Sequence, residues 1–177
     1  MKKLLTLIIV YFLVSVFNGS VFAQSQTEIS WDSVGNKILK GIITRNQLEA
    51  DTAFSWWAEN LKGYTPQSRA VAELKKNQSI QFITFMGTWC DDSRFVVPKF
   101  YSLLDAAGYP SDKVTLIGVD RKKKTLSHLA EALNIKNVPT IIVINNGKEI
   151  GRVVEYGKTG AFDLDLANIL SSINLSH

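Results

Sequence analysis

The sequence predicts an α/β fold with three layers, in which helices flank both faces of a central mixed sheet. Short apolar runs typical of buried strands alternate with segments of helical periodicity between residues 80 and 133. The dipeptide Asn146-Gly147 then joins two further strand-like runs, which is a strong hairpin signal. A last amphipathic stretch, residues 162–173, predicts a closing helix. We expect an N-terminal extension that contains a helix to precede this domain.

The chain begins with the features of a signal peptide, which we assign to residues 1–23. Lys2 and Lys3 supply the positive start, and the apolar stretch that follows, residues 4–17, is short for a bilayer span. A small residue, Ala23, then fits a cleavage site before Gln24. We therefore expect export to the periplasm or the medium, with no membrane attachment after cleavage. An uncleaved anchor is the less favoured alternative.

Charge and composition exclude some classes of function. The chain has 20 basic and 16 acidic residues, a formal charge of +4. Removing the two lysines of the signal peptide leaves about +2, which is too balanced to indicate a nucleic-acid partner. One cysteine and two histidines, His128 and His177, are far apart in the sequence and do not predict a metal site. The residues give no reason to expect a cofactor.

We divide the mature chain into an extension, residues 24–67, and a domain, residues 68–177. Residues 24–43 are polar and mixed, and we expect a partly ordered lead segment there. Helical spacing of apolar residues predicts a helix over residues 45–62, in which Trp57 packs inward. Thr65 is expected to cap the next helix, with Pro66 at its first position.

Within the domain, the pattern of apolar residues predicts four strands and three further helices. A nearly continuous apolar run, residues 114–119, is typical of a central parallel strand. Pro98 lies inside the expected helix 92–107 and removes a backbone hydrogen-bond donor there. The expected strands are residues 80–86, 114–119, 140–144 and 149–156, and the expected helices are residues 92–107, 126–133 and 162–173.

The only cysteine, Cys90, lies between the strand 80–86 and the helix that begins near Asp91-Asp92-Ser93. A thiol at a helix start feels the positive end of the helix dipole, which favours the reactive thiolate. A single cysteine in an exported chain also indicates a reactive thiol or an intermolecular partner. The alternative is a small buried residue that only packs. Polar residues directly after Cys90, and Trp89 before it, favour the functional interpretation.

The stretch Trp89-Cys90-Asp91-Asp92-Ser93 resembles the active-site motif of thioredoxin-like proteins, Trp-Cys-x-x-Cys at a strand-to-helix junction. Three further features occur in the same order and spacing as in that family, over about residues 68–173. They are Pro98 in the active-site helix, the loop Val138-Pro139-Thr140, and the hairpin turn 145–148 followed by Gly157. The resemblance implies a thioredoxin-like fold.

The sequence departs from that family at two positions. Ser93 stands where the second, resolving cysteine would be, and Thr84 stands where thioredoxins carry a buried acid. The motif Thr88-Trp89-Cys90-x-Asp-Ser is nevertheless similar to that of a group of secreted thioredoxin-like proteins. We therefore treat the serine at position 93 as a feature of that group. The Ser93 hydroxyl can donate a hydrogen bond to the thiolate.

The resemblance also implies which residues contact a substrate. It implies a cis peptide bond before Pro139, beside Thr140, with the backbone of Val138 open to pair with a substrate strand. Trp89 would shield the sulfur and offer an apolar contact. Asp91 and Asp92 disfavour the thiolate by charge and stabilise the helix start, and they would repel acidic partners. A role as plain helix-start acids is the alternative for both.

Two functions remain open. The first is monothiol disulfide exchange, of the oxidoreductase or isomerase type, through Cys90. Its partners would be protein thiols or disulfides and an external thiol reductant, because Ser93 cannot release a mixed disulfide. The second is a non-catalytic or chaperone-like module that captures client chains at the Val138-Pro139 face. Cys90 at a helix start favours the first function.

Overall fold

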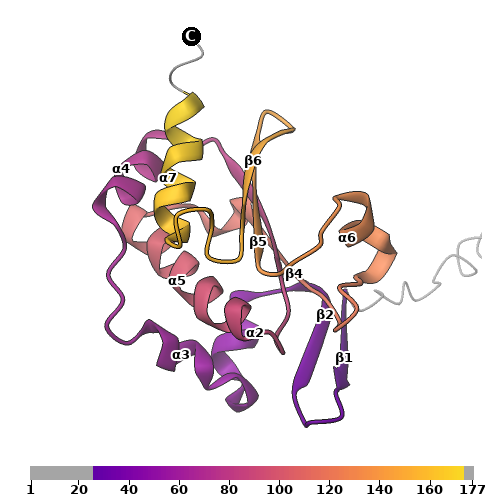
Figure 1. The fold of residues 1–177 in the computed structure, drawn as a ribbon. Coiled ribbons are helices and arrows are strands. Elements are labelled where there is room, and N and C mark those ends of the chain that lie inside the picture. Colours follow the sequence, from indigo (N-terminus) through magenta and orange to yellow (C-terminus); the bar gives the residue numbers. More distant parts are fainter. Residues whose placement is uncertain (1–25, 174–177) are drawn as a thin grey trace, which may run out of the picture.

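A computed structural model describes residues 26–173 and contains a six-stranded mixed sheet, ordered β1-β2-β4-β3-β5-β6 (Figure 1). Strands β3 and β4 pair in parallel, and the other neighbours pair antiparallel. The predicted signal peptide lies outside the described residues. The strands are β1 Thr27–Trp31, β2 Lys37–Ile43, β3 Gln81–Met86, β4 Val114–Gly118, β5 Thr140–Asn145 and β6 Lys148–Val154.

Helices cover both faces of this sheet (Figure 1). Helices α4, α5 and α7, with the shorter α2 and α3, lie on one face, whereas α6 lies on the other. The α-helices are α2 Arg45–Ala50, α3 Trp56–Leu61, α4 Ser68–Lys76, α5 Asp91–Ala107, α6 Leu129–Ala132 and α7 Phe162–Ile173. The 3-10 turns are η1 Thr52–Phe54, η2 Ser111–Lys113 and η3 Leu126–His128.

Alternation along β3 divides the core into two clusters. Phe82 and Met86 point into the larger cluster with Phe100 of α5, whereas Phe85 belongs to the smaller cluster with Ala130 of α6. Successive side chains of a strand point to opposite faces, so one apolar strand can supply both clusters. Strand β3 therefore holds the start of α5, and the cysteine before it, on a base that is buried on both sides.

The predicted three-layer α/β architecture is confirmed, including the parallel pairing of β3 with β4 and the hairpin at Asn146-Gly147. The predicted helix over residues 126–133 differs, because Ser127 and His128 adopt left-handed backbone angles. Residues 126–133 instead form the turn η3 followed by the short helix α6, where the Thr125 hydroxyl accepts a hydrogen bond from Ala130 N–H at 3.2 Å.

The prediction of a partly ordered lead segment was wrong for the described part of residues 24–43. Strands β1 and β2 form a hairpin there, and β2 joins the main sheet beside β4. Strand β1 is largely exposed, and the alternation of Ile29 and Trp31 with Glu28 and Ser30 over only five residues did not distinguish it from a polar, mixed segment. The extension is thus two strands of the sheet followed by helices.

The single helix predicted over residues 45–62 is divided at Asp51, whose backbone is extended. The Asp51 carboxylate caps η1 at Ala53 N–H, 2.9 Å away, and pairs with Lys37 of β2 at 2.5 Å. A carboxylate that satisfies free N–H groups favours a new helix start over continuation of the previous helix. Three short helical segments, α2, η1 and α3, result.

The predicted cap at Thr65 was also wrong, because α4 begins at Ser68. The Asp163 carboxylate of α7 accepts hydrogen bonds from Gln67 N–H at 3.2 Å and from the Tyr64 hydroxyl at 3.1 Å. A residue almost one hundred positions away therefore satisfies a free N–H group at this helix start, in place of a local cap.

Two glycines face each other where the N-terminal hairpin joins the sheet, Gly41 in β2 and Gly118 in β4. A Cβ atom at Gly118 would lie 2.1 Å from the backbone oxygen of Leu39. We expect Gly118→Ala to destabilise the protein by about 3 kcal/mol, because backbone must move to admit the methyl group. Chemical denaturation measures this loss.

Gly108→Ala is the matched control, since a Cβ atom there meets no atom within 4 Å and only the left-handed backbone is penalised. That penalty is about 1 kcal/mol. Equal losses in the two variants would show that the close pairing of β2 with β4 does not constrain the fold.

Candidate active site

Cys90 is the N-cap residue of α5, directly after the loop that leaves β3. Its carbonyl accepts the first helical hydrogen bond, from Arg94 N–H at 2.9 Å, and its own N–H donates to Gly87 O at 3.0 Å. The side chain is partly buried and forms no disulfide. A sulfur at this position faces the unpaired N–H groups and positive dipole of a 17-residue helix.

The sulfur lies against the loop before β5. Cys90 Sγ is 3.2 Å from the backbone oxygen of Val138 and donates to it, and the Val138–Pro139 peptide bond is cis. This contact requires the protonated thiol, because a thiolate has no hydrogen to donate. No hydrogen bond from the Val138 N–H to another described residue is found. Among the described residues, the thiol of Cys90 is therefore the partner found for the backbone of Val138.

Ser93 lies one helical turn after Cys90 and is fully buried. Its oxygen accepts a hydrogen bond from Gly87 N–H at 3.2 Å. Within residues 26–173, no hydrogen bond joins the Ser93 hydroxyl to the sulfur, although the sequence suggested that one could form. Ser93 therefore stabilises the loop that carries Cys90 in this state of the thiol.

Thr84, at the position of the family's buried acid, lies in β3 with no exposed surface. Its hydroxyl has no hydrogen-bond partner. An uncharged hydroxyl cannot serve as a proton acceptor for a neighbouring thiol at ordinary pH, so the sheet supplies no internal base at this point.

Trp89 is fixed beside the sulfur by three contacts. Its indole Nε1 donates to Val119 O at 3.0 Å, and the Arg121 guanidinium lies 5.1 Å from its ring centroid. Gly87 makes the third contact possible, because a Cβ atom there would lie 2.7 Å from the indole. These three contacts fix the orientation of the Trp89 ring.

Two residues that sequence reasoning missed hold the active-site loop. The buried Thr88 hydroxyl donates to Lys37 O at 2.8 Å and accepts from Leu39 N–H at 3.3 Å. Arg94 donates to Thr88 O and to the Asn36 side chain, both at 2.8 Å. These bonds connect the loop to the N-terminal hairpin. No local pattern indicates the bonds to the hairpin, because they join residues 49 to 58 positions apart.

A second connection runs from the same hairpin to Trp89. The nearly buried Asp32 carboxylate accepts two hydrogen bonds from Arg121, at 2.5 and 2.8 Å, and Arg121 lies over Trp89. Loss of hydration raises the pKa of Asp32, but hydrogen bonds from Asn36, Arg121 and Val34 outweigh it and hold that pKa well below its usual range.

The two predicted acids, Asp91 and Asp92, occupy the first turn of α5. Asp91 is exposed and pairs with Arg94 at 3.3 Å. Asp92 accepts a hydrogen bond from the Tyr156 hydroxyl at 2.9 Å, a partner that the sequence did not indicate. Partial burial and this bond raise the pKa of Tyr156 to about 12, so the hydroxyl remains a donor at neutral pH. The bond fixes Asp92 toward the β6 end of the site.

The predicted substrate-binding segment Val138-Pro139-Thr140 lies beside Cys90, but its side chains are buried. Thr140 donates to Asn137 O at 2.7 Å, and Pro139 O accepts from Glu155 N–H at 2.7 Å. The three residues thus form a buried wall against which the Cys90 sulfur lies.

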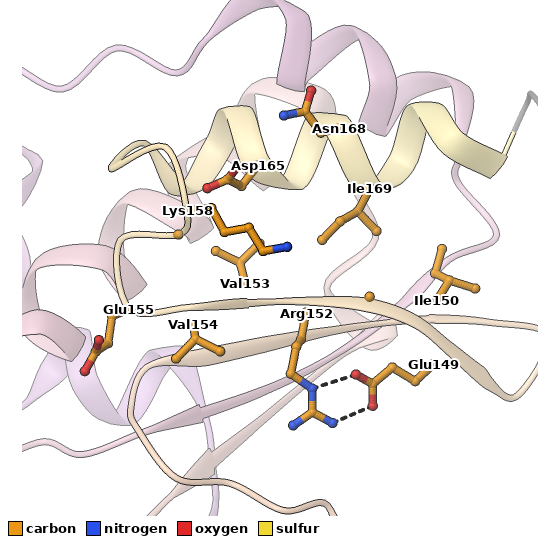
Figure 2. A pocket seen from close by; sticks show the side chains of 12 residues that line it. Glu149, Ile150, Arg152, Val153, Val154, Glu155, Lys158, Asp165, Asn168 and Ile169 are labelled. Carbon is orange, nitrogen blue, oxygen red and sulfur yellow. Dashed lines mark hydrogen bonds and ion pairs between the residues drawn. The ribbon is translucent and has the colours of Figure 1, made fainter.

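A cavity of about 820 Å³ lies elsewhere, between β6 and α7 (Figure 2). Ile150, Lys158 and Ile169 contribute to its lining, and an Arg152–Glu149 ion pair lies at its edge. None of the predicted site residues lines it. Its position places it outside the chemistry of Cys90.

Residues 26–173 contain no cluster of three side chains suited to hold a metal ion. Over the same range, no helix combines the length and apolar character needed to cross a bilayer.

The model of the Thioredoxin family matches residues 66–166, more than half of the chain. The chain belongs to the thioredoxin family. A thioredoxin of Echinococcus granulosus is 32% identical over 93 residues, which cover 52% of this chain and 81% of that protein. Thioredoxin H2-2 of Oryza sativa subsp. japonica is 40% identical over 73 residues, 41% of this chain and about half, 49%, of the rice protein. Members of this family act on protein disulfides.

Among solved structures, an HIV epitope-scaffold shares the fold with a TM-score of 0.51 at 14% sequence identity. The superposition covers 73% of this chain and 90% of the scaffold. The matched family segment begins at residue 66, so the hairpin that holds the active-site loop lies before it.

We expect Thr84→Val to stabilise the protein by about 1 kcal/mol, because a buried hydroxyl without a partner is replaced by a methyl group of similar shape. Urea denaturation measures the gain. Thr140→Val is the control: its hydroxyl is equally buried but bonded, so that variant should lose stability. A loss in Thr84→Val as large as the control's would show that the Thr84 hydroxyl has a partner.

Asp32 should make the hairpin sensitive to acid. A carboxylate whose pKa is lowered by folding stabilises the protein above its unfolded pKa, about 3.9, and that stabilisation is lost as pH falls toward the folded value. We therefore expect Asp32→Asn to reduce the melting temperature at neutral pH, and the difference from wild type to shrink below about pH 4. A difference that stays constant over this range would contradict the ion pair.

Proposed function

We propose that this chain is an exported thiol–disulfide exchange protein that works with one thiol. The observation that supports the proposal most is the position of Cys90, at the N-terminus of α5 with its sulfur 3.2 Å from Val138 O. A thiol at this junction has dipole support for its thiolate, a fixed aromatic wall in Trp89, and an adjacent backbone able to bind a strand.

The first step is attack by the Cys90 thiolate on one sulfur of a client disulfide. A bond forms between Cys90 Sγ and that sulfur, the client S–S bond breaks, and the other client sulfur leaves as a thiolate. Loss of the thiol proton also frees Val138 O. The client backbone can then pair with both polar groups of Val138 while the mixed disulfide forms.

The second step cannot be internal, because Ser93 carries a hydroxyl in place of a thiol. Either an external thiol or a second thiol of the client must attack the mixed disulfide. An external thiol returns Cys90 as thiolate and leaves the client joined to that thiol, whereas a client thiol leaves the client with a rearranged disulfide. One-thiol chemistry therefore suits isomerisation or exchange with a small thiol.

Export is part of the proposal. Its support is the order of charged, apolar and small residues in 1–23, together with a compartment in which client disulfides persist. Trp89, Asp91 and Asp92 would contact the client around the sulfur, and Val138-Pro139-Thr140 would supply the backbone surface.

A second candidate function is capture of clients without turnover. The buried, bonded Ser93 and the uncharged Thr84 favour it, since neither assists release of a mixed disulfide. The two functions differ in whether they require the Cys90 sulfur. Cys90→Ser would abolish exchange but leave capture of reduced clients intact.

Ser93→Cys tests the one-thiol mechanism. Position 93 lies one turn after Cys90, so a thiol there should close an intramolecular disulfide and release bound clients. Because the attack becomes intramolecular, we expect release on the order of 100-fold faster than with a millimolar external thiol. The measurement is the decay, on non-reducing gels, of the mixed disulfide that Cys90 forms when it attacks a disulfide of scrambled, denatured ribonuclease.

Cys90→Ser is the control and should trap no client in either background. Two free thiols in oxidised Ser93→Cys, with as much trapped client as in wild type, would contradict both the placement of residue 93 and the one-thiol mechanism.

A further inference from the structure

Several exposed apolar side chains belong to segments that are bonded to the active-site loop or to the start of α5. Four of the eight exposed large apolar side chains in residues 26–173 belong to segments bonded to the active-site loop or to the first turn of α5. Phe95 and Tyr156 pack with ring centroids 5.5 Å apart on one side, where Tyr156 is bonded to Asp92. Trp31 and Val34, at the end of the β1–β2 hairpin, are 63% and 75% exposed.

The hairpin tip, residues 31–36, is connected to two residues of the active-site loop, Thr88 and Trp89. Asn36 is joined to Thr88 O through Arg94, and Asp32 is joined to the Trp89 ring through Arg121. Asp32 also accepts hydrogen bonds from the N–H groups of Val34 and Asn36, at 3.0 and 2.8 Å, which close the turn on itself. The tip is therefore a preorganised part of the site.

These bonds use the polar groups of the tip and leave its apolar side chains facing solvent. Trp31 and Arg94 both line a cavity of about 430 Å³, and Arg94 donates a hydrogen bond to Thr88 O of the active-site loop. An exposed tryptophan beside a hollow gives the concave, partly apolar surface that is typical of a contact site.

We propose that the hairpin tip is a second client-binding surface, which holds an apolar part of an extended polypeptide while the client's cysteine reacts at Cys90. The inference rests on the proposed thiol exchange and names its substrate class: unfolded or misfolded chains with apolar residues near a disulfide. The kind of partner follows from the position of this surface next to the proposed binding site at Val138. Val138 offers backbone pairing at the sulfur, and only an extended chain can use that backbone and place side chains against Trp31 and Val34.

The test uses two nine-residue peptides with a central cysteine activated as a mixed disulfide with 2-nitro-5-thiobenzoate. One carries leucine on both sides of the cysteine, and the other carries serine. The Cys90 thiolate bonds to the peptide sulfur, the original S–S bond breaks, and the coloured thiobenzoate thiolate leaves with the electron pair. The rate with the serine peptide measures the reactivity of Cys90 itself. The ratio of the leucine-peptide rate to the serine-peptide rate measures the contribution of apolar contacts.

We expect wild type to prefer the leucine peptide on the order of 10-fold, and Trp31→Ser/Val34→Ser to lose most of that preference. Ile150→Ser is the matched control, because Ile150 is exposed on the opposite edge strand, β6, and should keep the wild-type ratio. A ratio unchanged in the double variant would overturn the proposal.

A second measurement separates this proposal from the exchange chemistry. In a Cys90→Ser background, fluorescence anisotropy gives the affinity for the leucine peptide with serine at its centre. If neither activated peptide reacts with wild type, thiol exchange fails, and a loss of affinity on changing Trp31 and Val34 still supports the surface. Unchanged affinity, or a wild-type dimer that the double variant dissociates, overturns it.

Discussion

The buried hydroxyl of Thr88 joins the loop that carries Cys90 to the backbone of β2, and much of the site depends on this bond. The hydroxyl bonds to both Lys37 O and Leu39 N–H, in the part of β2 that is not paired with β4. Buried backbone groups without partners are costly, so the loop and the strand stabilise each other. The N-terminal hairpin is therefore held in place by the active-site loop that it supports.

That mutual support gives the site an uncommon division of roles. The segment matched by the thioredoxin family supplies the thiol, the aromatic wall and the Val138 backbone, whereas the hairpin before it supplies the partners of Thr88, Arg94 and Arg121. Charged and amide groups of the hairpin point into the site, and its tryptophan and valine point outward. One short element can thus both position the loop and extend the surface available to a client.

Sequence reasoning predicted most of the domain between residues 80 and 173, and the reason is the strength of its periodic signals. Strand β3 is apolar on both faces, α7 has a continuous apolar face, and Asn146-Gly147 allows only a tight turn. The same reasoning placed Cys90 at a strand-to-helix junction, and the resemblance to thioredoxin-like proteins placed Val138 beside it. It failed for β1, which is exposed and only five residues long, and for the break at Asp51, which depends on Lys37 in another element.

The sequence alone determined the chemistry that is possible here: one thiol at a helix start, with no second cysteine, and with Thr84 at the position of the family's buried acid. These are properties of residue type and local order, which do not require knowledge of distant contacts. Only the tertiary structure decided how the thiol is surrounded. Thr88, Arg94, Arg121 and Tyr156 act through bonds that span from six to eighty-nine residues, and most join a loop or α5 to a distant turn. Pairing between distant segments leaves no periodic trace in the chain, because it is selected by the packing of the whole sheet.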